Sequence, residues 1–93
     1  MSAEPDARTR IDMNGPLTDD EYRRRLRELP PSAKLVARVL DDEAPLTHAE
    51  LVEESLLPDR TVRYALERLE GAALVESRLS FQDARKRLYV PSR

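Results

Sequence analysis

A chain of 93 residues that is 37% charged and contains no Cys has room for one small domain and excludes disulfides, thiolate chemistry and Cys-ligated zinc. With one His, a His-based metal site is not expected either. No apolar run approaches the roughly 18 residues that cross a bilayer, and the N-terminal sequence MSAEPDARTR lacks the hydrophobic segment of a signal peptide. We therefore expect a cytoplasmic protein without membrane contact.

The net charge of −2 hides an asymmetry between two parts of the chain. Residues 1–57 carry 8 basic and 13 acidic side chains, a net of −5, while residues 58–93 carry 8 basic and 5 acidic ones, a net of +3. Of the 16 basic residues 14 are Arg, which favours planar, bidentate contacts to phosphate or guanine. A GC-rich genome would also encode Arg in place of Lys, so Arg usage alone decides nothing.

Residues 1–16 are polar and show no apolar periodicity, which predicts a flexible tail. Residues 17–30 predict a leading helix, because Thr18 and Glu21 form a capping box and Pro30 ends the helical pattern. Its narrow apolar stripe consists of Tyr22, Leu26 and Leu29. Two interpretations of this stripe are open: packing into the core of the same chain, or contact with a second copy in a dimer.

Two further helical patterns follow. Ser32 is expected to open a helix that continues to about Asp42. Its predicted buried face consists of Leu35, Val36, Val39 and Leu40. Thr47 and Glu50 form a second capping box, which predicts a helix about two turns long. The apolar face of that helix consists of Leu51 and Val52.

The strongest helical pattern begins at about Pro58 or Asp59 and ends at Glu70. At about 100° per residue its apolar side chains fall on one stripe, which predicts a face packed on the core. That stripe consists of Val62, Ala65, Leu66 and Leu69. The outward face holds Arg60, Arg63, Tyr64, Glu67 and Arg68. Gly71 is expected to end the helix in left-handed geometry.

Beyond Gly71 the pattern changes to a period of two, which is typical of strands. The first alternating run consists of Val75, Ser77, Leu79 and Phe81, with polar residues between them. A second run, RLYV, covers residues 87–90, and a polar loop of about five residues, QDARK, separates the two. This order predicts a β-hairpin.

Two helices joined by a tight turn, the second with an outward basic face, form the arrangement that presents a recognition helix to the major groove. The sequence PSAKLVARVLDDEAPLTHAELVEESLLPDRTVRYALERLEGAALVE, followed by FQDARKRLYVPS, resembles the winged helix-turn-helix domain of MarR-like transcriptional regulators, especially the small archaeal ones. The resemblance covers residues 31–92. It implies an α+β, mostly helical fold with a three-helix core and a β-hairpin wing, here with an extra N-terminal helix.

Two motifs carry the resemblance. TVRYALERLEGAALVE resembles the family's recognition helix, and DARKRLYV resembles its wing, in which Asp83 would hold the wing in place and Arg85 would reach the minor groove. Pro58 departs from the family pattern, which commonly has a Ser or Thr N-cap there; it would serve instead as a first-turn proline. The sequence ends at Arg93, without the long C-terminal helix of the typical dimer, so the mode of dimerisation is open.

These observations predict a transcriptional regulator that binds specific double-stranded DNA, as a homodimer on a pseudo-palindrome. The recognition helix, about 59–70, would enter the major groove, and the wing, about 79–88, would lie at the minor groove or backbone. The predicted DNA-binding residues are Arg60, Thr61, Arg63, Tyr64, Arg68, Arg85, Lys86, Arg87, Thr47 and His48. For Glu67, we favour a surface ion pair with Arg63 over hydrogen bonding to a cytosine amine.

A winged-helix module that binds another protein within a larger assembly is the alternative function. Catalysis is not expected, because the sequence has no Gly-rich phosphate loop, no nucleophile with a base and no ligand cluster. Neither a cofactor nor a small-molecule ligand is indicated, and the acidic clusters lack the spacing of a Ca²⁺ loop.

Overall fold

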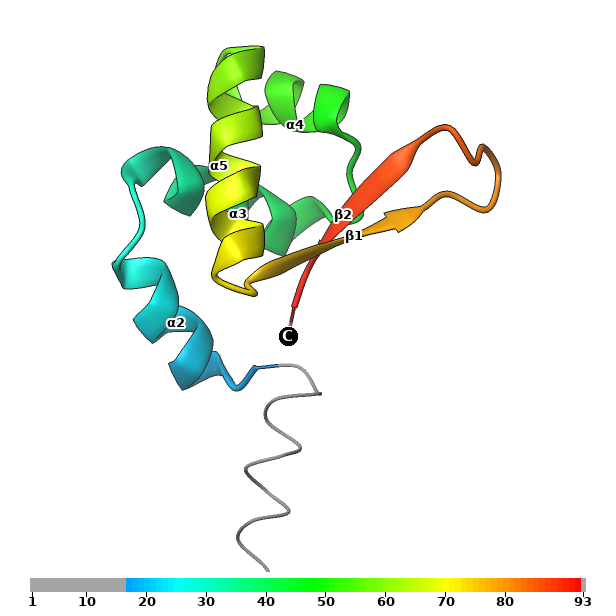
Figure 1. Ribbon diagram of the computed structural model, residues 1–93. Coiled ribbons are helices and arrows are strands. Elements are labelled where there is room, and N and C mark those ends of the chain that lie inside the picture. Colours follow the sequence, from blue (N-terminus) through cyan, green and yellow to red (C-terminus); the bar gives the residue numbers. More distant parts are fainter. Residues whose placement is uncertain (1–16, 93) are drawn as a thin grey trace, which may run out of the picture.

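The computed structural model describes residues 17–92 and has the predicted order of elements (Figure 1). The helices are α2 (Asp19–Arg27), α3 (Pro31–Glu43), α4 (His48–Ser55) and α5 (Asp59–Gly71), and the strands are β1 (Val75–Leu79) and β2 (Arg87–Pro91). The four helices and one antiparallel hairpin within residues 17–92 confirm the mostly helical α+β fold. The predicted tail, residues 1–16, lies outside the described residues. No helix in residues 17–92 is long and apolar enough to cross a membrane.

Helix α2 begins with the predicted capping box. The Thr18 N–H donates to Glu21 Oε1 at 3.1 Å, and the Glu21 N–H donates to Thr18 Oγ1 at 3.2 Å. Tyr22 and Leu29 are buried in the core, and Leu26 packs against it. Packing within one chain therefore accounts for these side chains, while their contact with a second copy stays a prediction.

Helix α3 begins one residue earlier than expected, at Pro31, and continues to Glu43. Its buried residues are Ala33, Val36, Ala37 and Leu40. The prediction was wrong for Leu35, which is 40% exposed, and Val39 is half-buried. The physical reason is the position of the buried face: its four residues recur at i, i+3, i+4 and i+7 from Ala33, so Leu35 lies on the opposite side of the helix.

The second capping box, at the start of α4, is also confirmed. The Thr47 N–H donates to Glu50 Oε1 at 2.8 Å, and the Glu50 N–H donates to Thr47 Oγ1 at 3.2 Å. The C-cap of α4 is Leu56, which adopts left-handed backbone geometry with φ 62°. Pro58 is the N-cap of α5 and provides no side-chain hydrogen bond, so it is not the first-turn proline that was expected.

The end of α5 corrects another prediction. Gly71 is the last helical residue and has no positive φ; the left-handed residue is Ala73, with φ 61°. The helix includes Gly71 because the Ala72 N–H still donates to the Arg68 carbonyl, at 3.1 Å. The turn at Ala73 then brings Leu74 into the core, where it is completely buried.

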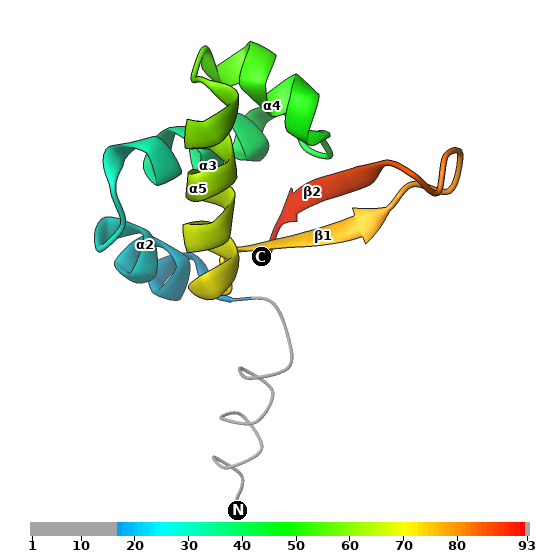
Figure 2. The ribbon, with the colours of Figure 1, turned by 45° about the horizontal axis from the view of Figure 1, so that its top comes forward.

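The hairpin forms as predicted, but only its base is buried. Strands β1 and β2 pair from Val75↔Pro91 to Leu79↔Arg87, and the connecting loop is 80–86, longer than the five residues expected. Val75 is buried, whereas Leu79 is 58% exposed and Phe81 is fully exposed. The alternation did not predict this exposure, because the hairpin extends beyond the helices and no core lies against its tip (Figures 1 and 2).

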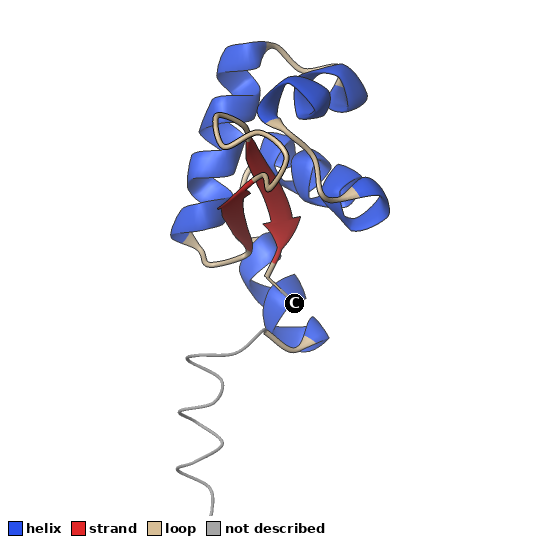
Figure 3. Ribbon diagram, turned by 90° about the vertical axis from the view of Figure 1, so that its right-hand side faces the viewer, coloured by secondary structure: helices blue, strands red, loops and turns tan. Residues whose placement is uncertain are grey.

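Backbone hydrogen bonds attach the base of the hairpin to the rest of the molecule. The Tyr89 N–H donates to the Leu46 carbonyl at 2.8 Å, and the Leu46 N–H donates to the Tyr89 carbonyl at 3.2 Å. The Leu17 N–H donates to the Ser92 carbonyl at 3.0 Å, which joins the first and last described segments. Figure 3, which looks along the hairpin from its tip, shows the strands in front of the helices. The hairpin therefore has a fixed base and a projecting tip.

Candidate nucleic-acid interface

The core determines which side chains α5 presents to solvent. Its four predicted core residues, Val62, Ala65, Leu66 and Leu69, are all buried. The opposite face is exposed as predicted and holds Arg60, Arg63, Tyr64, Glu67 and Arg68. Thr61, at the edge of this face, is half-buried. The outward direction of the arginines thus follows from burial of the apolar stripe.

The first turns of α4 and α5 meet at Asp59. Its Oδ1 lies 2.6 Å from Nε2 of His48, and its Oδ2 accepts a hydrogen bond from Nη2 of Arg63 at 3.1 Å. Because carboxylate oxygens accept hydrogen bonds, the imidazole Nε2–H is the donor. The predicted pair between Arg63 and Glu67 is therefore wrong. Asp59 lies four residues before Arg63 and Glu67 lies four residues after it, so either carboxylate could pair with Arg63 on the helix surface. In the structure the ion pair is with Asp59.

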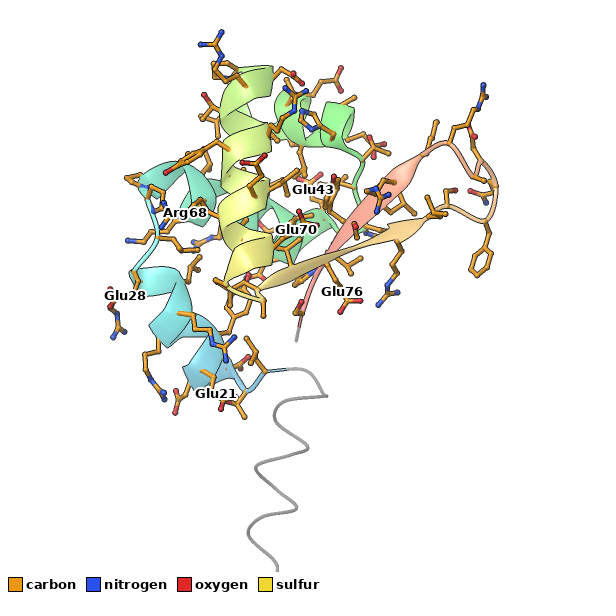
Figure 4. The ribbon with its side chains drawn as sticks, in the orientation of Figure 1. Glu21, Glu28, Glu43, Arg68, Glu70 and Glu76 are labelled. Atoms are coloured by element: carbon orange, nitrogen blue, oxygen red, sulfur yellow. The ribbon has the colours of Figure 1, made fainter. Side chains whose placement is uncertain are left out.

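Tyr64 and Arg68 form a pair of their own on α5. Nη1 of Arg68 donates to the Tyr64 hydroxyl at 2.8 Å, and the guanidinium carbon lies 5.8 Å from the ring centroid, a cation–π distance. Arg68 projects on the side of α5 away from the hairpin (Figure 4). These two predicted contacts are thus separated from the His48, Asp59 and Arg63 group.

A shallow hollow lies between the start of α4 and strand β2. Its lining residues are Thr47, His48, Ala49, Glu50, Lys86, Arg87 and Tyr89. Four predicted DNA-binding residues from distant parts of the sequence share this surface. The Arg87 guanidinium is held across the hairpin, where Nη1 donates to Ser77 Oγ at 2.9 Å. Glu50 is the acidic member of the lining, and it is engaged in the α4 capping box.

Local hydrogen bonds, rather than a core, hold the loop at the tip of the hairpin. Ser80 Oγ accepts from the N–H groups of Gln82 and Asp83, at 3.2 and 3.3 Å. Asp83 Oδ1 in turn accepts from the backbone N–H and from Nε of Arg85, at 3.0 and 3.2 Å. The hydrogen bond from the Arg85 side chain, followed by that from its backbone, lowers the pKa of Asp83. The Arg85 side chain is still 91% exposed.

Three contributors to this surface were not predicted from the sequence. Asp59, Ser77 and Ser80 each hold a side chain or loop that carries a basic residue. The spacing of Asp59 and Arg63 was a visible signal for one contact. The contacts of Asp59 with His48 and of Ser77 with Arg87 join different elements, so no sequence spacing indicates them.

A second concave surface, of about 380 Å³, lies between α2 and α3. It is lined by Tyr22, Arg23, Leu26, Arg27, Lys34, Ala37, Arg38 and Asp41. Four cationic side chains and one acidic side chain surround apolar side chains. This pocket was not predicted, because its residues come from two helices whose packing the sequence pattern does not determine. Within residues 17–92, no cluster of three or more His, Asp or Glu side chains is arranged for a metal ion.

By sequence, no family model and no curated protein matches the chain. Solved structures do match it. NMB1585, a MarR family regulator from Neisseria meningitidis, is 31% identical over 70% of this chain and 46% of its own length, with a TM-score of 0.57. MepR of S. aureus, in complex with DNA, is 17% identical over 77% of this chain and 61% of its own, with a TM-score of 0.64. The fold is a winged helix.

A third winged-helix structure adds a regulatory example. BpsR of Bordetella bronchiseptica, whose DNA binding is regulated by 6-hydroxynicotinic acid, is 22% identical over 77% of this chain and 58% of its own, with a TM-score of 0.66. The present chain spans 46% to 61% of the lengths of these three proteins. In the winged-helix arrangement, α4 and α5 form the helix-turn-helix and the β1–β2 hairpin with its loop is the wing.

Proposed function

We propose that this protein is a MarR-like transcriptional regulator that binds specific double-stranded DNA. The observation that carries the proposal is the exposed pair Arg60 and Arg63 on α5, fixed in direction by the buried opposite face and flanked by a basic wing. A guanine edge offers two acceptors to an Arg fork in the major groove, and a good pair of this kind discriminates by about 1 to 3 kcal/mol. Similarity to small archaeal members stays a prediction from the sequence.

Phosphate contacts would fix the register of the protein on the duplex. The hollow between α4 and β2 brings Thr47 and His48 close to Lys86 and Arg87, so a backbone segment lying there meets donors from both sides. Arg85, held by Asp83 yet almost fully exposed, would reach a narrow minor groove beside it. Tyr64 and Arg68 would extend the contact along α5.

A pseudo-palindromic site bound by a homodimer remains our expectation for the whole assembly. A regulator of this kind works where the chromosome is, in the cytoplasm, and needs no catalytic group. Tyr22 in α2 and Leu29 just after it are buried within one chain, so the surface with which α2 would contact a second copy has to include other residues.

Binding of the purified protein to mixed-sequence duplex DNA across a salt series tests the function. The logarithm of the affinity should fall linearly with the logarithm of salt concentration, with a slope of about −0.9 for each phosphate contact. Arg85→Ala should lower the slope by about one contact, and Arg60→Ala with Arg63→Ala should weaken binding further. Arg24→Ala, on α2, is the matched control and should leave the slope unchanged.

Absence of binding at low salt would contradict the DNA-binding proposal. The second class of function would then stand, a winged-helix module that binds another protein. Under that function, substitution of Arg60 and Arg63 would leave partner binding intact. The two classes are thus separated by the same pair of variants.

The pocket between α2 and α3 favours a regulated form of DNA binding, with a small organic anion as effector. Its four cationic side chains attract negative charge, while Tyr22, Leu26 and Ala37 offer apolar contact. The regulation of BpsR by 6-hydroxynicotinic acid supports this choice of ligand class. Calorimetric titration with 6-hydroxynicotinic acid should show binding that Arg27→Ala with Arg38→Ala abolishes and Arg24→Ala preserves. Equal heats for all three proteins would contradict it.

A further inference from the structure

An acidic side chain lies in the middle of the surface proposed for DNA. Asp59 is the first residue of α5, and each of its carboxylate oxygens has a different partner. Oδ1 accepts a hydrogen bond from Nε2 of His48, in the first turn of α4, at 2.6 Å. Oδ2 accepts one from Nη2 of Arg63 at 3.1 Å. One carboxylate therefore connects the two helices of the helix-turn-helix and one of the two central arginines.

This arrangement opposes non-specific DNA binding. A carboxylate near the phosphates repels them and offsets part of the attraction from the neighbouring arginines. Stabilisation of the α5 dipole does not by itself explain the position, because an acidic side chain anywhere in the first turn would provide it. The exposed ion pair with Arg63 is also a small contribution to stability. What remains distinctive is the shared contact with His48 and Arg63.

The contact restricts the direction of the Arg63 guanidinium. An unrestrained Arg loses rotamer freedom when it binds a base, and a restrained one loses less. Because Nη2 of Arg63 donates to Asp59, the direction of the planar guanidinium is set, and its other N–H donors stay available to a base. At a base pair that offers these donors no acceptor, Arg63 forms no base contact. Nothing then offsets the repulsion between the Asp59 carboxylate and the phosphates. The correct base pair is thus favoured twice, by preorganisation and by the penalty on the others.

We propose that Asp59 is a specificity-determining positioning residue, which aims Arg63 and lowers the affinity of the protein for non-cognate DNA. This inference rests on the proposed DNA-binding function. His48 belongs to the same unit, since its imidazole fixes the other oxygen of the carboxylate and thereby the direction in which Asp59 holds Arg63.

The experiment uses a preferred duplex selected with the wild-type protein from a randomised library of about 20 base pairs, long enough for two half-sites one helical turn apart. Dissociation constants are measured at one ionic strength for this duplex and for a shuffled duplex of the same composition. The variants are Asp59→Asn and the matched control Glu67→Gln. Both remove one negative charge from the exposed face of α5, but Glu67 makes no ion pair within the described residues.

Both variants should bind the shuffled duplex about threefold more tightly, because each removes one repulsive charge. Glu67→Gln should tighten binding to the preferred duplex by the same factor. Asp59→Asn should instead lower the ratio of the two affinities about tenfold, the size expected for loosening one base contact. In an Arg63→Ala background, Asp59→Asn should cause no further loss of the ratio, because its effect acts through that side chain.

An unchanged ratio for Asp59→Asn would overturn the inference while leaving the DNA-binding function intact. An equal loss of affinity for both duplexes, with a lower melting temperature, would also overturn it and assign Asp59 a purely structural role. A further loss of the ratio in the Arg63→Ala background would show that Asp59 does not act through Arg63. If the wild-type protein bound neither duplex, the proposed function itself would fail, and the inference with it.

Discussion

Helix α5 and the wing both present arginines to solvent, but different forces fix the directions of these side chains. In α5, four buried residues on one face determine the direction of every outward side chain. In the wing, Val75 and Leu74 are buried at the base, while the tip depends on hydrogen bonds made by Ser80 and Asp83. Burial fixes a whole helix at once, whereas each local hydrogen bond fixes a few atoms near the surface.

This difference separates cooperative from local stability. A change in the core-facing side of α5 should affect the unfolding of the whole domain, because its residues pack with α3 and α4. A change at the wing tip should alter the motion of the loop with little effect on global unfolding. Four sets of substitutions test this distinction, from the largest expected effect on unfolding to the smallest.

Two leucines ten positions apart provide the largest contrast. Leu69 in α5 is completely buried, whereas Leu79 in the wing is 58% exposed. Leu69→Ala should lower the free energy of unfolding by about 2 to 5 kcal/mol through lost burial and a cavity. Leu79→Ala should change it by less than about 0.5 kcal/mol. Urea denaturation followed by circular dichroism measures both, and comparable losses would show that the wing belongs to the cooperative core.

The cap of α4 lies between the two regions, beside the hollow shared with β2. Thr47→Ala removes the hydroxyl that accepts from the Glu50 N–H, and it should cost about 1 kcal/mol of unfolding free energy. Thr61→Ala is the matched control, because Thr61 lies inside α5 and makes no cap. An equal loss for both variants, measured by urea denaturation, would show that the capping hydroxyl has no special contribution.

A pair of carboxylates at the ends of α3 and α4 should have a smaller, pH-dependent effect. The neighbouring Glu54 carboxylate, more than burial or Asp42, raises the pKa of Glu43 above its usual 4.5. Because the pKa of Glu43 is higher in the folded protein than in the unfolded chain, protonation of Glu43 stabilises the fold. This stabilisation is fully present below the pKa of the unfolded chain and is lost as the pH rises through the pKa of the folded protein. Glu43→Gln should therefore be slightly more stable than the wild type at neutral pH and lose that advantage in acid.

Thermal unfolding at several pH values measures this difference. Glu54→Gln should reproduce the effect of Glu43→Gln, since the repulsion needs both carboxylates. Glu53→Gln is the control on α4 and should not reproduce it. A melting-temperature difference for Glu43→Gln that does not depend on pH would contradict the electrostatic explanation.

The smallest global effect is expected at the wing tip. Asp83→Ala removes the acceptor of the Arg85 backbone N–H, so amide exchange of Arg85 should become faster while global unfolding changes by less than about 0.5 kcal/mol. Glu76→Ala breaks another exposed ion pair of the wing, that with Arg78, and should leave the exchange of Arg85 unchanged. Nuclear magnetic resonance measures exchange residue by residue. A large decrease in the free energy of global unfolding in Asp83→Ala would contradict the conclusion that the wing tip is stabilised only locally.

The same loop should respond to acid. The pKa of Asp83 in the folded protein is lower than the usual 3.8. The ionised carboxylate therefore stabilises the loop at any pH above 3.8, and this stabilisation is lost as the pH falls through the pKa of the folded protein. The amide signal of Arg85 should thus stay at its neutral position until the pH drops below the usual range of an Asp. In Asp83→Ala this acid-dependent shift should be absent.

Several features could be predicted from the sequence because they depend on residues close together in the chain. Both capping boxes were correct, since Thr18 and Thr47 each lie three residues before the Glu that completes the box. The buried stripe of α5 was correct because large apolar side chains at helical spacing have one common face. The order of helices and hairpin followed from the change of apolar period after Gly71.

Only the tertiary structure decided the features that depend on what lies across from a residue. It turned Leu35 outward, moved the left-handed residue from Gly71 to Ala73 and left Phe81 exposed. It also joined His48 to Asp59, eleven positions apart, and placed Thr47 near Lys86 in one hollow. Sequence spacing determines which residues share a face of one element. Packing between elements determines which faces are buried and which side chains from separate elements meet.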